Sequence, residues 1–536
     1  MKYLFGNGRV FLGDSARSWS QAVGVCDGKI AAVGSESDVR EEIGAGTVDI
    51  DLGGRFLIAG FQDAHVHPMM GGLARMRCNL EHVSDLGTAL TVVADYVNGT
   101  DTGWVLGGGW NYHWFEGGNP AGALLDAITD RPVYLGGADG HSGWANSTAL
   151  RLADISAATP DPEDGRIERL SDGSPQGTLH EGAMHLMERA VPQVDAATLR
   201  AALLEGQRYL LSLGITAWQD AWVTGPLHET YRELATSGDL KAAVRGCLWW
   251  DRERELDQLG ELVVASREGV GAYDPRTIKL MLDGVCENHT AALLEPYLDQ
   301  AGTETDNTGL DFIPTDDLAE IVTRIDAVGL QCHFHALGDR AVRNALDAIA
   351  AARRVNGWTD TRPHLAHLQL VDPADIPRFR QLGATANAQP LWAVLDGSMS
   401  DLTIPFIGPA RTGHQYPWKS LLAAGATMAM GSDWSVSTPD VMAQIDIAVH
   451  RNDPARGIDK VFLSDQRIGL ADALMAFTAG SAHVNHRDSV SGSIERGKQA
   501  DLAVLNADPF ALERPRDIGV DMTMIAGEVV FEGESV

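Results

Sequence analysis

Cysteine, basic charge and long apolar runs are all scarce in this sequence of 536 residues. The five cysteines are widely separated and odd in number, and none forms a CxxC pair: Cys26, Cys78, Cys247, Cys286 and Cys332. A disulfide framework needs paired cysteines in an oxidising compartment, so this usage argues against one. We therefore expect reduced, mostly buried thiols and a cytoplasmic location.

Basic residues are outnumbered by acidic ones, with 42 Lys and Arg against 73 Asp and Glu and a formal net charge of -31. This balance argues against nucleic-acid backbones and anionic membranes as partners. No segment approaches the ~20 apolar residues of a membrane span, and the first residues lack the apolar core of a signal peptide. The sequence predicts a soluble protein that acts on a small molecule, and it leaves a homodimer open.

The composition is otherwise that of an ordinary globular protein, with 44% hydrophobic and 21% charged residues. Short apolar strands alternate with turns in residues 1–57, and the same pattern returns in residues 485–536. Neither end has enough strands for a domain of its own. We therefore expect the two ends to pair in one small β-sandwich domain.

The middle of the chain, residues 58–484, alternates candidate strands with helical stretches such as 339–353, for which Asp339 is the expected N-cap. A first strand ends near His65, and seven more are expected at 215–219, 243–249, 278–282, 331–335, 364–368, 384–388 and 427–430. Eight βα units predict a (β/α)8 TIM-like barrel. The connection after strand 1 is far longer than a βα loop, so residues of about 70–210 are read as an inserted subdomain.

The barrel is organised around the stretch Gly60-Phe61-Gln62-Asp63-Ala64-His65-Val66-His67-Pro68. Residues two apart on a strand point to the same face, so His65 and His67 aim two imidazoles at one point. A divalent metal ion needs such an arrangement. The alternative is a buried strand whose histidines are satisfied by hydrogen bonds.

Other polar residues end the predicted strands where a barrel of this type carries its active groups. His335 ends the fifth strand, His367 lies near the end of the sixth, and Asp433 follows the eighth. Imidazoles and a carboxylate suit zinc, and also manganese, iron or cobalt. The sequence thus predicts a divalent metal site.

Some positions stay open at this stage. His333 and His335 share a face, so only the preference for the strand's end favours His335. His364 and His367 are three apart, so only one of them is expected to enter the barrel. Lys279, flanked by apolar residues on the fourth strand, is either a salt-bridged lysine paired with Asp283 or, after reaction with carbon dioxide, a carbamate that bridges two metal ions.

The ordered motifs resemble the amidohydrolase superfamily, and more closely its YtcJ-like branch, amidohydrolase family 3. They are His65-x-His67, Lys279 with Asp283-Gly284, His335-Ala-Leu-Gly-Asp-Arg-Ala, His367-Leu-Gln, Gly431-Ser-Asp433, Asp139-Gly140-His141 and Ser491-Gly492-Ser493-Ile494-Glu495. The resemblance covers nearly the whole chain. The chain departs from the family pattern at Ala366 and at Trp434-Ser435-Val436, which affects the expected substrate contacts more than the metal ligands.

The resemblance implies a role for each residue. His65 and His67 would hold the more buried metal, and His335 and His367 the second. Carboxylated Lys279 would bridge the two, although some relatives use a single ion. Asp433 would contact a metal and act as general base and then acid on the attacking water. His141, from the insertion, would stabilise the oxyanion.

The implied activity is hydrolysis of an amide-type carbon–nitrogen bond, as in N-substituted formamides, N-acyl compounds or cyclic amides. We expect Trp110, His141 and Asp283 to contact the substrate, while the alternative for Trp110 is that it packs the insertion. An esterase or lactonase, a ring deaminase, and a metal-containing binding or regulatory protein without turnover are the competing functions.

Overall fold

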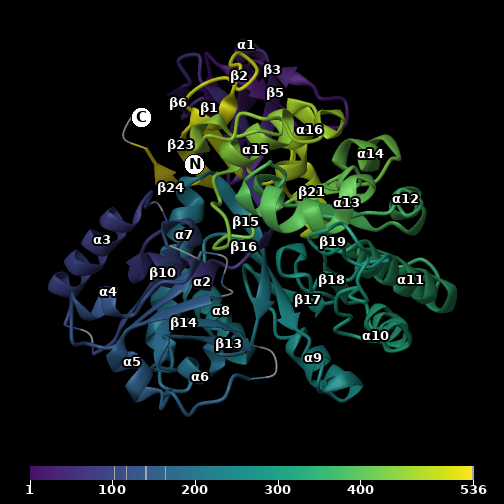
Figure 1. The fold of residues 1–536 in the computed structure, drawn as a ribbon. Helices are drawn as coiled ribbons and strands as arrows, with labels where there is room; N and C mark the ends of the chain where they lie inside the picture. Colours follow the sequence, from purple (N-terminus) through teal and green to yellow (C-terminus); the bar gives the residue numbers. More distant parts are fainter. Residues whose placement is uncertain are drawn as a thin grey trace. The chain divides into compact units, whose positions relative to one another are not determined.

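The computed structural model of the chain describes residues 1–81, 83–101, 103–115, 118–138, 140, 142–162 and 165–533, with only the backbone described at 113, 181 and 188. These residues form two compact units. The first consists of Met1–His67 and Gln207–Val536, and the second of Pro68–Gly206. The first unit holds a barrel together with strands from both ends of the chain (Figure 1).

Eight parallel strands form the barrel, each hydrogen-bonded to the next in chain order. They are β8 (Phe61–Val66), β15 (Ile215–Val223), β16 (Ala243–Trp249), β17 (Tyr273–Met281), β18 (Gln331–Ala336), β19 (His364–His367), β20 (Thr385–Ala388) and β21 (Met428–Met430). Every residue of β8, β18, β19 and β20 is buried, as expected for a parallel sheet covered on both faces. The predicted barrel is thereby confirmed.

Helices cover the outside of the barrel, as Figure 1 shows for α10, α11 and α12 beside β17, β18 and β19. The helices that follow the strands include α8 (Gly225–Ser237), α9 (Leu259–Ala265), α10 (Thr315–Ala327), α11 (Asp339–Asn356), α12 (Ile376–Leu382), α14 (Trp418–Ala423) and α15 (Val441–His450). In α11 the buried face is apolar and repeats at helical spacing, through Val342, Ala345, Leu346 and Ile349. Burial of such faces against the strands holds the barrel together.

The seam between the first and last strands is closed just beyond the end of β21. The Asp433 N–H donates to the His65 carbonyl at 2.8 Å, and the His67 N–H donates to the Trp434 carbonyl at 2.7 Å. Oδ1 of Asp63 accepts from the backbone N–H groups of His65 and Ser432, both at 3.0 Å. The seam therefore sets the histidines that end β8 beside Asp433.

Strands from the two ends of the chain combine in a six-stranded sheet with the order β24-β23-β22-β7-β2-β3. Its strands are β2 (Arg9–Phe11), β3 (Trp19–Ser20), β7 (Phe56–Ala59), β22 (Leu502–Leu505), β23 (Val520–Ile525) and β24 (Glu528–Glu532). The antiparallel pair β7 and β22 joins the two ends. This confirms a small sheet domain built from both termini, although the predicted limit at residue 57 falls inside β7.

A second sheet of this domain has the order β5-β4-β1-β6. It consists of β1 (Lys2–Gly6), β4 (Ala22–Cys26), β5 (Lys29–Gly34) and β6 (Val48–Asp51), and α1 (Glu36–Ile43) packs on it through Val39 and Ile43. The apolar core shared with the first sheet includes Phe5, Val25, Leu57 and Val504.

The second unit is built on one six-stranded sheet with the order β13-β14-β12-β11-β10-β9. Its strands are β9 (Cys78–Asn79), β10 (Val105–Trp110), β11 (Val133–Gly137), β12 (Ser142–Ala145), β13 (Gly165–Arg169) and β14 (Pro175–Glu181). The helices are α2 (Pro68–Met76), α3 (Leu86–Gly99), α4 (Ala123–Asp126), α5 (Ser147–Leu152), α6 (Met184–Glu188) and α7 (Ala196–Ser212), whose last residues belong to the first unit. One of its cores gathers Trp110, Leu135 and Trp144.

Two further expectations can be compared with the structure. Asp339 is not the N-cap of α11: Gly338 takes that position, and the Asp339 carboxylate instead accepts the Leu294 N–H at 2.8 Å. All five cysteines are free and four are buried, as predicted. Within the described ranges, no helix combines the length and apolar character needed to cross a bilayer.

Candidate metal centre

The candidate site lies at the carboxyl ends of the barrel strands, where β8 brings two histidines together. β8 ends at Val66, between His65 and His67. Nε2 of His67 lies 3.0 Å and Nε2 of His65 lies 3.3 Å from the same atom, Oδ1 of Asp433. The strand alternation that placed both imidazoles on one face thus directs them to one carboxylate oxygen.

Asp433 is held in place by its backbone rather than by its side chain. Its φ of 54° lies in the left-handed region, which a non-glycine residue adopts only when the surroundings enforce it. Among the described residues, Oδ1 has no hydrogen-bond partner, so both imidazole nitrogens approach it without hydrogen-bond geometry. Burial by itself would raise the pKa of Asp433, but His65, His67 and His367 hold it well below its usual range. The carboxylate is therefore ionised.

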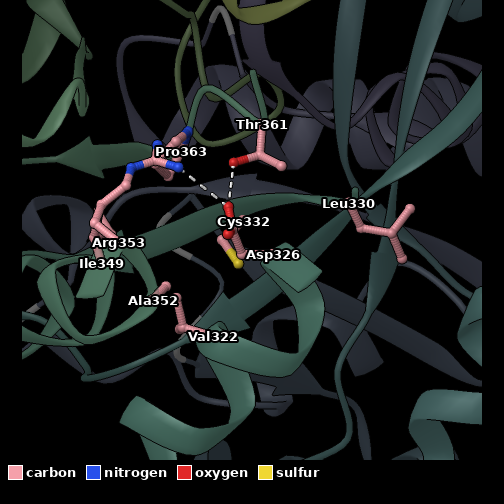
Figure 2. A pocket seen from close by; sticks show the side chains of 9 residues that line it. All are labelled: Val322, Asp326, Leu330, Cys332, Ile349, Ala352, Arg353, Thr361 and Pro363. Atoms are coloured by element: carbon pink, nitrogen blue, oxygen red, sulfur yellow. Dashed lines mark hydrogen bonds and ion pairs between the residues drawn. The ribbon is translucent and has the colours of Figure 1, made fainter. Parts of the chain in front are cut away.

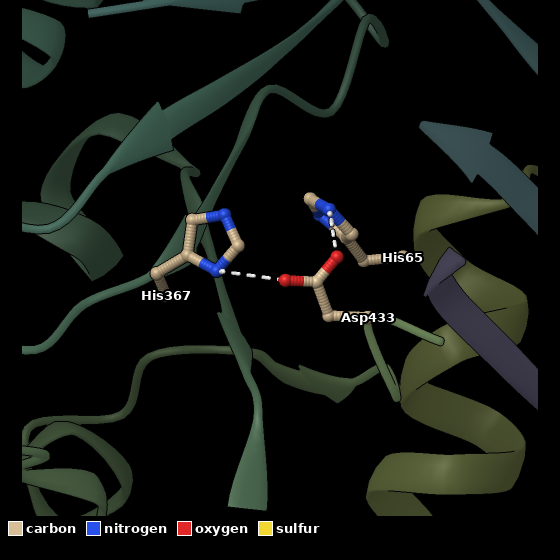
Figure 3. A group of neighbouring side chains, drawn as sticks. All are labelled: His65, His367 and Asp433. Atoms are coloured by element: carbon tan, nitrogen blue, oxygen red, sulfur yellow. Dashed lines mark ion pairs between the residues drawn. The ribbon is translucent and has the colours of Figure 1, made fainter. Parts of the chain in front are cut away.

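His367 completes this group from the opposite side of the carboxylate. Its Nδ1 lies 4.0 Å from Oδ2 of Asp433, and Figure 3 marks this ion pair with a dashed line. Nδ1 has no hydrogen-bond partner among the described residues. Trp392 stacks on the ring at 5.0 Å between centroids with planes 5° apart, which fixes the ring plane.

His364 and His367 both enter the barrel, so the expectation that only one of them can is wrong. Nε2 of His364 lies 2.7 Å from Oε1 of Gln219 inside the barrel. β19 ends at His367, whose φ of 80° breaks the two-residue alternation and turns its side chain inward as well. The alternation rule holds only for extended backbone.

His335 lies beside His367, with ring centroids 4.5 Å apart, at the end of β18. Its Nε2 is 3.3 Å from the Gly284 carbonyl and 3.8 Å from Oδ1 of Asp283. Burial, and then the charge of Lys279, lower the pKa of His335 to about 3. The ring is therefore neutral.

Lys279 faces the barrel interior from β17. It lies two residues after Thr277, whose hydroxyl donates to Gln331 inside the barrel, so the two side chains share a face. Lys279 is 3% exposed. Burial lowers its pKa to about 8, while the nearby charge of Asp433 acts in the opposite direction. Asp283 is not among the groups that influence it.

The residues present fit a divalent metal ion. One ligand atom each from His65, His367 and Asp433 lies within 4.8 Å of the others, and all three residues are buried. Burial, and then Lys279, lower the pKa of His65 to about 3, and burial lowers the pKa of His367 well below its ordinary value. Neutral imidazoles and an ionised carboxylate are the states in which these side chains bind metals.

Two of the predicted substrate contacts do not fit the structure. Trp110 is 0% exposed in the core of the second unit, where its indole donates to the Leu135 carbonyl at 2.8 Å. Asp283 is also 0% exposed, and its oxygens accept three backbone N–H groups from neighbouring loops. Residue type alone did not reveal this burial. The third predicted contact, His141, lies outside the described residues.

Sequence reasoning missed Gln219 and Asn387, which belong to a set of polar side chains inside the barrel. Gln219, His364 and Asn387 are fully buried and bonded to one another or to His333. The available signal was a polar residue within each predicted apolar strand. It did not stand out, because one such residue per strand is common.

Comparisons with known proteins identify relatives of this chain. The Amidohydrolase family profile matches residues 49–531. Protein LONG AFTER FAR-RED 3 of Arabidopsis thaliana is 31% identical, over 98% of this chain and 91% of that protein. Putative amidohydrolase YtcJ of Bacillus subtilis is 28% identical, over 99% of this chain and 100% of that protein. The N-substituted formamide deformylase of Arthrobacter pascens is 29% identical, over 98% of this chain and 97% of that protein.

A solved structure gives the same result for the fold. The crystal structure of an uncharacterized metal-dependent hydrolase from Pyrococcus furiosus superposes with a TM-score of 0.75 and 25% identity, covering 95% of this chain and all of that one. The resemblance to the YtcJ-like branch is confirmed. The chain belongs to the amidohydrolase family and is a metal-dependent amidohydrolase.

Proposed function

We propose that the protein hydrolyses an amide-type carbon–nitrogen bond of a small molecule at the cluster of His65, His67, His367 and Asp433. The observation that carries this proposal is the approach of the His65 and His67 imidazoles to one carboxylate oxygen that has no hydrogen-bond donor among the described residues. His65, His67 and Asp433 would hold one ion, and His335 and His367 a second. Zinc suits this set of nitrogen and oxygen ligands.

Carboxylated Lys279 would complete the pair of metal positions. Nζ attacks carbon dioxide, a nitrogen–carbon bond forms, and one proton leaves to water. The product is an anionic carbamate with two oxygens that can bridge. Support comes from the inward position of Lys279 and its 3% exposure, since burying an ammonium group is costly.

A bound ion would make water more acidic and polarise the scissile carbonyl. Asp433 would accept the proton of the attacking water and deliver it to the leaving nitrogen, as general base and then general acid. Its depressed pKa keeps the carboxylate ionised before the reaction. Trp392 would keep the His367 ring in its plane. An oxyanion contact from His141 stays a prediction.

The first substrates to test are N-substituted formamides, because one relative of 29% identity carries the name N-substituted formamide deformylase. N-acyl compounds and cyclic amides follow. Esters and lactones are attacked by the same chemistry, and ring deamination and binding without turnover are the remaining alternatives. The fold does not choose among these, because this barrel supports many chemistries.

The test is a screen of protein loaded with zinc or manganese against pooled formamides, amides, lactams, lactones and esters, with release of amine and acid followed with and without chelator. We expect chelator-sensitive amine release. Asp433→Asn keeps the shape but should lose nearly all rate, whereas Asp299→Asn, which changes an exposed carboxylate, should retain it. A variant at Asp433 that keeps full turnover would contradict the proposed role.

A further inference from the structure

Next to the candidate metal residues, toward the amino ends of the strands, the barrel interior is filled by polar side chains that the proposed mechanism does not use. These residues, which we call the polar layer, are Gln219, Cys247, His333, His364 and Asn387. All five are 0% exposed. Buried polar groups persist in proteins when they are hydrogen-bonded. The directions of these hydrogen bonds can be derived from the backbone groups at their ends.

The side chain of Gln331, at the start of β18, fixes the direction of the first hydrogen bonds. One end of its side-chain amide lies 2.8 Å from the Arg362 carbonyl and 2.9 Å from the Val484 carbonyl. Carbonyl oxygens only accept, so this end is the NH2 group. The opposite end, Oε1, therefore accepts, and the Thr277 hydroxyl donates to it at 2.7 Å.

Gln219 continues this chain of hydrogen bonds across the barrel. Its Nε2 donates to Oε1 of Gln331 at 3.2 Å, so its own Oε1 faces the other way and accepts. Nδ1 of His333 and Nε2 of His364 both lie 2.7 Å from this oxygen. Each of these ring nitrogens must therefore carry a proton.

His333 connects this chain of hydrogen bonds to His65, a predicted metal ligand. Its Nε2 lies 2.8 Å from Nδ1 of His65. No carboxylate contacts His333 among the described residues, and a buried imidazolium without one is costly, so the ring is neutral with its proton on Nδ1. Nε2 of His333 then accepts a hydrogen bond from Nδ1 of His65. The remaining ring nitrogen of His65, Nε2, keeps its lone pair and faces Asp433.

We propose that His333 is a positioning residue that, through the chain Gln331–Gln219–His333, holds His65 in the tautomer with a free Nε2 lone pair. This inference rests on the proposed metal site, because the lone pair matters only to an ion bound there. A histidine ligand commonly donates its other N–H to an oxygen acceptor; here the acceptor is a second imidazole. Loss of such a partner lowers metal affinity by about 10–100-fold.

The test compares His333→Leu, which removes the acceptor, with His333→Gln, whose amide offers both an acceptor and a donor. Gln219→Met interrupts the chain one step away without touching His65, so it also serves if His333→Leu fails to fold. Gln258→Met is the matched control: Gln258 is buried in the same unit and its side chain is bonded to backbone groups of Asp251 and Glu255, outside the polar layer.

Two measurements are made on each variant. The first is the imidazole ¹⁵N spectrum of metal-free protein, with the His65 signals assigned by their loss in His65→Gln. The second is the zinc dissociation constant from competition with a chromophoric chelator. We expect a single His65 tautomer, protonated at Nδ1, in wild type, Gln258→Met and His333→Gln. In His333→Leu and Gln219→Met we expect a shift toward the tautomer protonated at Nε2, which the Asp433 carboxylate favours, with about 10–100-fold weaker zinc binding.

The two measurements separate this inference from the proposed function. A wild-type protein that binds no zinc but shows the single tautomer would overturn the metal site and leave the hydrogen-bond chain intact. Unchanged tautomer and unchanged affinity in both His333→Leu and Gln219→Met would overturn the inference. Equal loss in Gln258→Met would also overturn it, since the effect would then follow from general destabilisation.

Discussion

Asp283 is the buried group whose removal has the most specific consequence. Oδ2 accepts the backbone N–H groups of Ala292 at 3.0 Å and of Gly338 at 2.8 Å, and Oδ1 accepts that of Leu337 at 3.1 Å. The carboxylate thus joins the loop after β17 to the loop after β18, the strand in which His335 lies. We expect Asp283→Ala to loosen both loops.

The magnitude follows from the number of donors left behind. Each buried N–H without a partner costs about 1–3 kcal/mol, so the three together cost at least about 3 kcal/mol. Since every 1.4 kcal/mol is about a tenfold change in an equilibrium constant, the amides of Ala292, Leu337 and Gly338 should exchange their hydrogens about a hundredfold faster. Total stability is only about 5–15 kcal/mol, so the melting temperature should also fall.

Hydrogen exchange followed by mass spectrometry measures this effect peptide by peptide. The control is Asp299→Ala, because Oδ1 of Asp299 also accepts two backbone N–H groups, from Ala301 at 2.8 Å and Thr303 at 2.9 Å, but on an exposed loop that water can reach. If the peptides containing Ala292, Leu337 and Gly338 exchange no faster in Asp283→Ala than in Asp299→Ala, the reasoning is refuted.

Three further predictions concern the seam, the metal and pH. A Cβ at Gly431 would lie 2.5 Å from the His65 backbone nitrogen and 2.8 Å from the His65 Cβ, so Gly431→Ala should lower the stability by about 1–3 kcal/mol and weaken zinc binding. The control Gly34→Ala, with nothing within 4 Å of the added atom, should change neither the stability nor the zinc affinity. Equal zinc affinities in the two variants would contradict this prediction. Zinc at a hundred times its dissociation constant should stabilise the protein by about 2.7 kcal/mol. This should appear as a higher melting temperature that chelator reverses. A melting temperature independent of zinc would contradict the metal site. Burial, and then the charges of Arg245 and Arg362, lower the pKa of His486 from 6.5 to about 4. Between these pH values the unfolded chain binds more protons than the folded one, so the stability should rise with pH there. Denaturation midpoints across this range should depend less steeply on pH in His486→Gln than in wild type, and parallel curves would refute the assignment.

Local periodicity was sufficient for the barrel and for its first two site residues. The strand predicted at 243–249 is β16 with the same ends, because an apolar run bounded by turns carries its own signal. His65 and His67 converge because residues two apart on an extended strand share a face, a property of the backbone itself. Neither required knowledge of the rest of the molecule.

Three-dimensional packing decided what periodicity could not. His364 and His367 both face inward because the backbone leaves the extended region at His367. Asp433 reaches the histidines only because the seam hydrogen bonds join two segments more than 360 residues apart in sequence. Trp110 and Asp283 looked like substrate contacts by residue type, but burial and hydrogen bonding assign them to a core and to two loops.

The sequence by itself therefore determined the barrel, the sheet domain shared by the two ends and the family, since all of these follow from local patterns repeated along the chain. Only the tertiary structure decided that His333 contacts His65 while His335 lies beside His367, and which way the buried amides and imidazoles donate. The reason is physical: a hydrogen bond such as that between His65 and His333 depends on the register of strands distant in sequence, and no local pattern encodes that register.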